Sequence, residues 1–162
     1  MKISNIETFF VSRFLVVRIT TEDGTEGIGE SCYWSYPKAA EATIHGFKDT
    51  LIGMDADDIE HIWTYLWRYN SAFRGNSIGG AISAIDIALW DIKGKRLETP
   101  IWNLLGGKVR NKVRAIAQGI AGNNPDEYAI GAKKVLDEGF TALKFTPMAE
   151  EWAKMSYTKM IK

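Results

Sequence analysis

The sequence predicts an α+β domain followed by the first β-α-β unit of a second domain. Two observations carry this prediction. Up to residue 112, three strand patterns precede three helical patterns, which is the order typical of an α+β fold. From residue 113 onward the order changes to strand, helix and strand, the pattern of a parallel β-α-β unit.

The three N-terminal strands are expected to form an antiparallel meander. They cover residues 2–11, 14–20 and 25–32, and an EDG stretch supplies turn chemistry between the last two. Gly27 and Gly29 in the third strand are not followed by a helix, so they do not predict a phosphate-binding loop.

Three helices are expected after the meander. Apolar residues recur at helical spacing between residues 37 and 53, between 59 and 70, and between 78 and about 96. Pro37 is typical of a first helical turn, and Asp55 is expected to cap the second helix.

The second unit begins with a strand pattern at residues 113–119. A helix follows, opened by Asn124 with a proline after it and ended by Gly139, and a second strand is expected at residues 141–146. Parallel sheets need neighbouring strands and helices on both faces. We therefore expect the second domain to continue beyond residue 162.

The composition narrows the possible partners and compartments. Of 162 residues, 46% are hydrophobic and 25% charged, with 20 basic against 20 acidic residues, which argues against nucleic acid and anionic membranes as partners. The chain lacks an apolar run long enough to span a bilayer, and its N-terminus lacks the apolar core of a signal peptide. The single cysteine, Cys32, cannot form an internal disulfide, so a cytoplasmic location is expected.

One lysine, Lys144, lies within the apolar run of the last predicted strand. Burying an ammonium group is costly unless it is paired or loses its charge. Alternate residues of a strand share a face, so Ala142, Lys144 and Thr146 point the same way. Either the lysine stem is buried and its ammonium reaches solvent, or Lys144 belongs to a site.

A specific motif follows residue 80. The stretch AISAIDIALWDIKGKRLETPIWNLLGG resembles a signature of the mandelate racemase and muconate lactonizing branch of the enolase superfamily. Together with the FRGN stretch at residues 73–76, it is most similar to the galactonate dehydratase type of acid-sugar dehydratase. The matching positions are Ala81, Ser83, Ala84, Asp86, Ala88, Leu89, Asp91, Gly94, Lys95, Pro100, Leu104, Leu105 and Gly106.

The physical interpretation of this motif is structural. Ala81, Ala84 and Ala88 are small residues three and four apart, which allows close packing of the helix against its neighbours. Asp86 and Asp91 are expected to cap or pair rather than to catalyse. The motif therefore indicates the family without containing its chemistry.

The resemblance implies a fold and a reaction. A capping domain, residues 1–112, would cover a (β/α)7β TIM-like barrel, of which residues 113–162 form the truncated start. The intact protein would be a metal-dependent acid-sugar dehydratase, a lyase that removes the α-proton of a sugar acid and eliminates the β-hydroxyl as water, leaving a 2-keto-3-deoxy acid. The resemblance implies Mg2+ held by ligands beyond residue 162, and the 162-residue chain alone is expected to be inactive.

Two other functions remain open at this point. One is a racemase or epimerase of the same superfamily, and the other is a non-catalytic capping or oligomerisation module. The family also implies a homo-oligomer, from dimer to octamer, acting on a small sugar acid.

The resemblance also implies site residues in the barrel. In the racemase pattern the second barrel strand ends in Lys-x-Lys, and Lys144 matches the first lysine, which is associated with the substrate carboxylate. Thr146 stands at the second position, where a threonine cannot act as the base. The galactonate dehydratase type also lacks this lysine and takes its base from histidine on other strands. Lys144 is thus the predicted catalytic residue and Thr146 a predicted substrate contact.

Three further candidates lie in the cap. Trp34 and Tyr36 follow the last meander strand, where the family places a specificity loop over the barrel mouth; they either contact substrate or fill the cap–barrel interface. Arg74 either binds a carboxylate or is an exposed arginine at a helix start. His45 and His61 lack a second ligand at helical spacing and are interpreted as structural or solvated.

Overall fold

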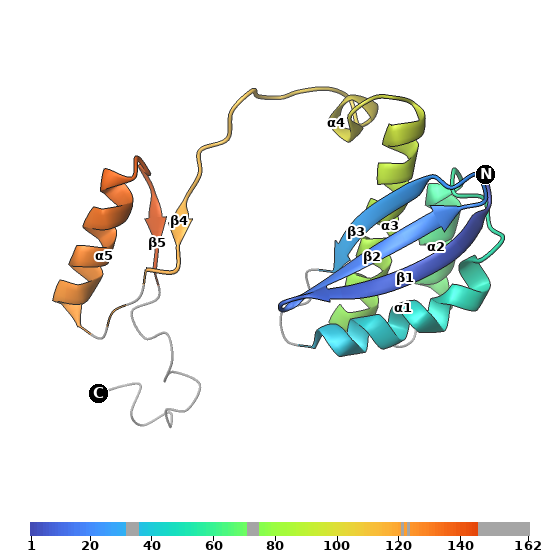
Figure 1. The fold of residues 1–162 in the computed structure, drawn as a ribbon, viewed down its shortest axis with the longest axis horizontal. Helices are drawn as coiled ribbons and strands as arrows, with labels where there is room; N and C mark the ends of the chain where they lie inside the picture. The colour runs from blue at the N-terminus through green and yellow to red at the C-terminus, as the bar shows by residue number, and fades with distance from the viewer. Residues whose placement is uncertain (32–35, 71–74, 121, 123, 146–162) are drawn as a thin grey trace. The chain divides into compact units, whose positions relative to one another are not determined.

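The computed structural model describes residues 1–31, 36–70, 75–120, 122 and 124–145. The chain forms two compact units, Met1–Lys108 and Val109–Lys162 (Figure 1). Among the described residues, the first unit contains a three-stranded sheet with helices, and the second contains two parallel strands and one helix. This confirms the predicted fold class.

The sheet of the first unit is an antiparallel meander, as predicted. Strands β1 (Ile3–Val11), β2 (Phe14–Thr21) and β3 (Glu26–Ser31) are hydrogen-bonded in that order. The turn between β2 and β3 is held by Asp23, whose carboxylate accepts a hydrogen bond of 3.1 Å from the backbone N–H of Thr25. A short side chain with hydrogen-bonding oxygens thus closes the turn that the EDG stretch predicts.

Four helices follow in the described part of the first unit. They are α1 (Pro37–Leu51), α2 (Ile59–Tyr69), α3 (Asn76–Arg96) and α4 (Ile101–Leu104). The first three correspond to the predicted helical patterns. The short helix α4 was not predicted, because four residues are too few to show a helical period.

The predicted cap of α2 was wrong. Asp58, not Asp55, precedes the first turn of α2. The Asp55 carboxylate instead accepts hydrogen bonds from the N-terminal amine of Met1, at 2.6 Å, and from the backbone N–H of Asp57, at 3.0 Å. The bond from the N-terminal amine is the main reason why the pKa of Asp55 is lowered from its ordinary value. A charged partner 54 positions away in the sequence therefore decides the role of this aspartate.

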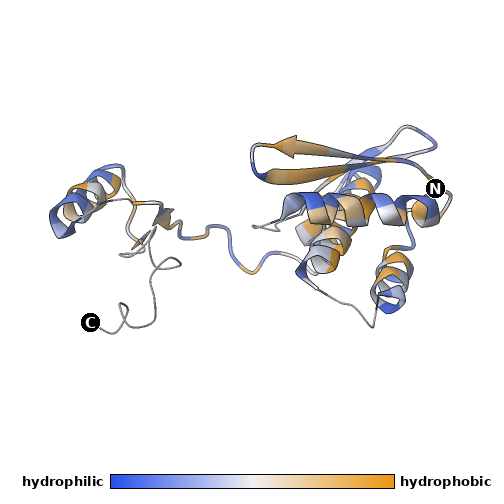
Figure 2. Ribbon diagram, turned by 90° about the horizontal axis from the view of Figure 1, so that it is seen from below, coloured by the Kyte–Doolittle hydropathy of each residue, from blue (hydrophilic) through white to orange (hydrophobic). Residues whose placement is uncertain are grey.

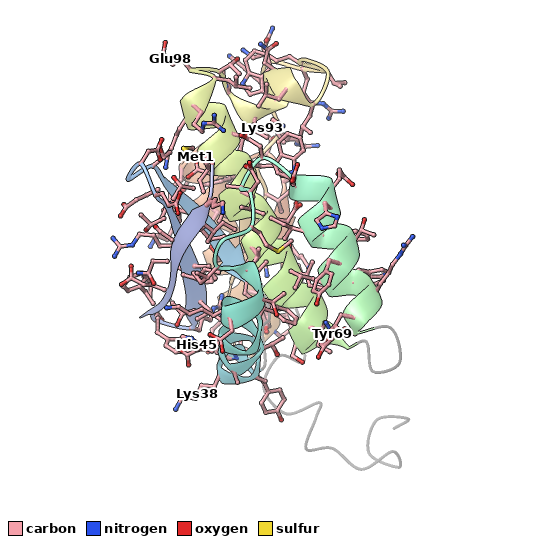
Figure 3. The ribbon with its side chains drawn as sticks, turned by 90° about the vertical axis from the view of Figure 1, so that its right-hand side faces the viewer. Met1, Lys38, His45, Tyr69, Lys93 and Glu98 are labelled. Atoms are coloured by element: carbon pink, nitrogen blue, oxygen red, sulfur yellow. The ribbon has the colours of Figure 1, made fainter. Side chains whose placement is uncertain are left out.

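The core lies between the sheet and helices α1–α3, which cover one of its faces (Figure 3). The strands are mostly hydrophobic in colour in Figure 2, whereas the helices alternate between apolar and polar residues. Helix α3 is central, because it contacts β2, β3, α1 and α2. Its buried residues are Ala81, Ile82, Ala84, Ile85, Ala88, Leu89, Ile92 and Gly94.

Helix α3 packs directly on β3, because glycines of the strand face alanines of the helix. A Cβ atom on Gly27 would lie 2.1 Å from the carbonyl oxygen of Ala88, and one on Gly29 would lie 1.9 Å from that of Ala84. Neither position has room for a side chain. The prediction that the alanines of the motif allow close packing is therefore confirmed, and it explains the two glycines of β3.

Side chains from the helices satisfy backbone groups at both edges of the sheet. At the β3 edge, the Asp91 carboxylate accepts a 2.9 Å hydrogen bond from the backbone N–H of Ile28. At the β1 edge, the Lys48 ammonium donates a 3.0 Å hydrogen bond to the carbonyl oxygen of Ile6. Charged side chains at an edge discourage pairing with further strands. Asp91 thus pairs, as predicted.

The second unit contains the predicted β-α-β arrangement. Strands β4 (Ala117–Gln118) and β5 (Leu143–Lys144) pair in parallel, and α5 (Pro125–Asp137) lies between them in the sequence. The helix begins as predicted, because the Asn124 side chain accepts a 3.0 Å hydrogen bond from the backbone N–H of Glu127.

Both strands of the second unit are shorter than predicted. The patterns cover residues 113–119 and 141–146, whereas each observed strand has two residues, and Thr146 lies outside the described part. Strand hydrogen bonds need a neighbouring strand. In the described part of the chain, β4 and β5 have only each other, so the ladder extends only where they face one another.

Candidate functional site

Lys144 ends β5, and the register of the parallel pair places it beside Gln118 at the end of β4. Both residues are exposed. The two strands run in the same direction, so these residues share the carboxyl end of the pair. Barrels of parallel strands bind their ligands at this end. Gln118 and Lys144 therefore mark the candidate site of the second unit.

Helix α5 packs on the opposite face of the strand pair. Ala117, which precedes Gln118, is only 8% exposed. Phe145, which follows Lys144, contacts Tyr128 of α5, with ring centroids 5.1 Å apart. Successive side chains of a strand point to opposite faces. Gln118 and Lys144 consequently lie on the face that α5 leaves uncovered.

The amino end of the strand pair carries a structural polar contact. Nε of Arg114 donates a 2.9 Å hydrogen bond to the Thr141 hydroxyl, and the same guanidinium donates to the Thr141 carbonyl oxygen. At the carboxyl end, by contrast, the Lys144 ammonium has no hydrogen-bond or ion-pair partner within the described residues. The Lys144 side chain is exposed.

The candidates in the cap are only partly described. Tyr36 immediately precedes α1, and its side chain is 66% exposed. Its backbone carbonyl oxygen accepts a 2.9 Å hydrogen bond from the N–H of Ala39, which fixes the start of the helix. Trp34 and Arg74 lie outside the described residues, as does Thr146 of the second unit.

The carboxyl end of β3 and the amino end of α3 lie at the same end of the first unit (Figure 1). Gly27 lies against Ala88 and Gly29 against Ala84, so β3 runs antiparallel to α3 and ends where α3 begins. Ser31, the last residue of β3, is 3% exposed, and its hydroxyl has no hydrogen-bond partner among the described residues.

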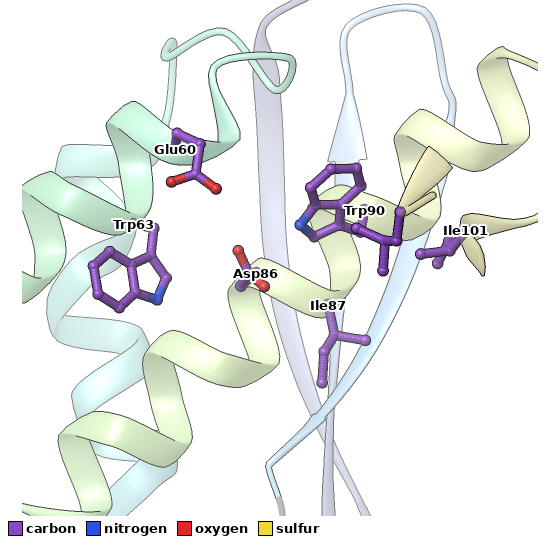
Figure 4. A pocket seen from close by; sticks show the side chains of 7 residues that line it. Glu60, Trp63, Asp86, Ile87, Trp90 and Ile101 are labelled. Atoms are coloured by element: carbon purple, nitrogen blue, oxygen red, sulfur yellow. The ribbon is translucent and has the colours of Figure 1, made fainter. Parts of the chain in front are cut away.

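A separate pocket lies between α2, α3 and α4 and has a volume of about 590 Å³. Figure 4 shows the carboxylates of Glu60 and Asp86 in it, with the indole rings of Trp63 and Trp90 on either side. Burial raises the pKa of Asp86, and the charge of Glu60 raises it further. The prediction that Asp86 caps or pairs was wrong, because no described residue bonds to its carboxylate. Tyr36, a predicted site residue that the structure describes, is not among the residues that line this pocket.

The described residues do not form a magnesium site. Among them, no group of three or more His, Cys, Asp or Glu side chains lies close enough to hold a metal ion. Hard divalent cations require several converging oxygen ligands, and the candidate site contains an amide and an ammonium instead. In the described part of the chain, no helix is both long and apolar enough to cross a membrane.

Residues 2–106 match the family model described as the N-terminal domain of mandelate racemase and muconate lactonizing enzyme. The chain belongs to this family. The match ends where the first unit ends, near Lys108. It includes the whole motif around α3, in which Asp91 holds the β3 edge and the alanines pack on Gly27 and Gly29.

Relatives extend the similarity into the second unit. A D-galactonate dehydratase of Pectobacterium atrosepticum is 38% identical over 151 residues, which cover 93% of this chain and 39% of that protein. The crystal structure of an enolase superfamily member from Salmonella Typhimurium is 32% identical, with a TM-score of 0.84 over 91% of this chain and 42% of that one. An enolase from Pantoea ananatis, solved with bound D-gluconate and Mg, is 31% identical, with a TM-score of 0.77 over 88% of this chain and 35% of that one.

The chain therefore spans about two fifths of the length of these relatives. Among the chain's own residues, Gln118 was not predicted to belong to the candidate site. Its place at the end of a predicted strand was a signal, but its position beside Lys144 depends on the register of two strands separated by a helix.

Proposed function

We propose that the intact protein is an acid-sugar dehydratase. The observation that carries this proposal is the 38% identity to a D-galactonate dehydratase, which extends over 93% of this chain and so includes both units. The gluconate bound to the enolase from Pantoea ananatis supports a sugar acid as the class of substrate. Water is lost from the acid and a 2-keto-3-deoxy acid is formed.

The two parts of the chain have different roles in this proposal. Residues 1–112 form the capping domain, and residues 113–162 form the first strand, helix and second strand of a TIM-like barrel. Trp34, Tyr36 and Arg74 contribute to substrate recognition from the cap. The protein acts in the cytoplasm as a homo-oligomer.

Lys144 binds the substrate carboxylate at the carboxyl end of β5. Removal of the α-proton leaves an electron pair that is delocalised into the carboxylate, and a nearby ammonium stabilises this added negative charge. The electron pair then forms the double bond as the β-hydroxyl leaves with a proton as water. The enol formed tautomerises to the 2-keto-3-deoxy acid.

Other catalytic groups are assigned to the barrel beyond residue 162. They include the general base, since the hydroxyl of Thr146 cannot serve as one, and the ligands of Mg2+. The bound Mg of the Pantoea neighbour supports a divalent cation as the cofactor. Such an ion supplies stabilisation of negative charge on substrate oxygens when bound.

The proposal is tested by incubating the intact protein and MgCl2 with a panel of sugar acids that includes D-galactonate and D-gluconate. Formation of a 2-keto acid is followed with semicarbazide, and proton NMR in D2O follows the α-position. We expect a 2-keto-3-deoxy product from at least one acid. Deuterium at the α-carbon with retention of the β-hydroxyl would instead indicate a racemase or epimerase, and no reaction with any acid would favour a non-catalytic module.

A further inference from the structure

The residue paired with Lys144 across the two barrel strands has no role in the function proposed above. Gln118 and Lys144 are register partners on parallel strands. Neighbouring strands lie about 4.8 Å apart, and register partners point to the same face. A group held by the Lys144 ammonium therefore lies within reach of the Gln118 carboxamide.

The surroundings of Gln118 argue against a packing role. Its neighbour Ala117 is buried, whereas Gln118 is exposed on the face that α5 does not cover. No hydrogen bond to its carboxamide occurs within the described residues. Interior positions of parallel barrels that serve packing carry bulky branched apolar side chains. A carboxamide at the carboxyl end of such a strand instead suits contact with a polar ligand.

We propose that Gln118 is a substrate-binding residue that recognises the α-hydroxyl of the sugar acid whose carboxylate lies at Lys144. This inference rests on the proposed function. In the substrate, the α-hydroxyl is the polar group next to the carboxylate. In the protein, Gln118 is the residue next to Lys144 on the neighbouring strand. A carboxamide both donates and accepts hydrogen bonds, as a hydroxyl does, and it leaves the charge balance at Lys144 unchanged.

Gln118→Leu removes the hydrogen bonds of the side chain at nearly constant size. In the intact protein, we expect the Kd for the preferred sugar acid, measured by calorimetry, to rise about 10-fold in this variant. Gln118→Glu should weaken binding further, because its carboxylate repels that of the substrate. Circular dichroism and thermal melting show whether each variant is folded, and Gln118→Asn, which keeps a shortened amide, is a second variant with an intermediate effect expected.

A 2-deoxy sugar acid, which lacks the α-hydroxyl, separates recognition from a structural effect. Wild-type protein should bind it about 10-fold more weakly than the α-hydroxy acid, and Gln118→Leu should bind the two equally. A preference retained by Gln118→Leu, or a Kd within twofold of wild type, would overturn the role of Gln118. If the wild-type protein binds sugar acids but does not dehydrate them, only the proposed function is overturned. The Kd values of wild type and Gln118→Leu still show whether Gln118 contacts the bound acid. No binding of any sugar acid would overturn both.

Discussion

The carboxylate of Asp91 on α3 accepts a hydrogen bond of 2.9 Å from the backbone N–H of Ile28 on β3. The same oxygen accepts a 2.7 Å hydrogen bond from the ammonium of Lys95, which also donates to the carbonyl oxygen of Glu26 at 2.7 Å. Asp91 and Lys95, two charged residues of the family motif, thus bond to backbone groups of β3 at the edge of the sheet, where a further strand would otherwise pair. Their place in the motif has a structural reason that involves no catalysis.

Replacing Asp91 with alanine should destabilise the protein by about 1–2 kcal/mol. Loss of the Asp91 carboxylate leaves the backbone N–H of Ile28 without its acceptor and Lys95 without its ion-pair partner. Because the side chains of Asp91 and Lys95 are partly exposed, the loss of stability is limited. Equilibrium urea unfolding, followed by tryptophan fluorescence, measures the change. Asp49→Ala is the control, because Asp49 is exposed on α1; equal effects of the two substitutions would contradict the role of Asp91.

Gly29→Ala should destabilise the protein by about 3 kcal/mol or prevent folding. The added methyl group would lie 1.9 Å from the carbonyl oxygen of Ala84, so β3 and α3 must separate. Gly46→Ala is a matched control within helix α1, where a Cβ atom meets nothing within 4 Å. This control should stabilise by up to about 1 kcal/mol through helix propensity. Similar thermal midpoints for the two variants would show that the close packing is not needed.

Asp86→Asn should stabilise the protein at pH 7. The pKa of Asp86 is raised above 3.8 by burial and by Glu60, so its ionised form is less favourable in the folded than in the unfolded state. This destabilisation is present above the folded pKa and disappears as the pH falls toward 3.8. The gain in unfolding free energy from Asp86→Asn should therefore shrink on acidification. Glu60→Gln should also raise the unfolding free energy, but by less than Asp86→Asn. An increase in the stabilising effect of Asp86→Asn at low pH would contradict the destabilising role of the Asp86 charge.

Lys144→Met in the intact protein tests the site proposed for the second unit. The substitution removes the charge and keeps most of the side-chain volume, so kcat/KM should fall on the order of 100-fold or more. Stability should change little, because Lys144 has no ion partner in the described part of the chain. Lys133→Met on the exposed surface of α5 is the control and should retain normal kinetics. Kinetics of Lys144→Met within threefold of wild type would leave Lys144 as a solvated lysine outside the active site.

The sequence by itself determined the order of the elements, because helical and strand periods are local properties. The apolar repeats around Ile82 and Leu89 predicted α3, and Asn124 with the proline after it predicted the start of α5. The family motif was recognisable for the same reason, since its residues are continuous in the chain. The small size of Ala84 and Ala88 also predicted close packing before the partner was known.

Only the tertiary structure decided which distant groups meet. Asp91 lies 63 positions from Ile28 in the sequence, and Asp55 lies 54 positions from the N-terminal amine that displaces it from the predicted cap. The lengths of β4 and β5, and the position of Gln118 beside Lys144, depend on pairing across α5. Hydrogen-bond partners of strand edges and the burial of a carboxylate such as Asp86 arise from neighbours in space, and residue periodicity carries no record of those neighbours.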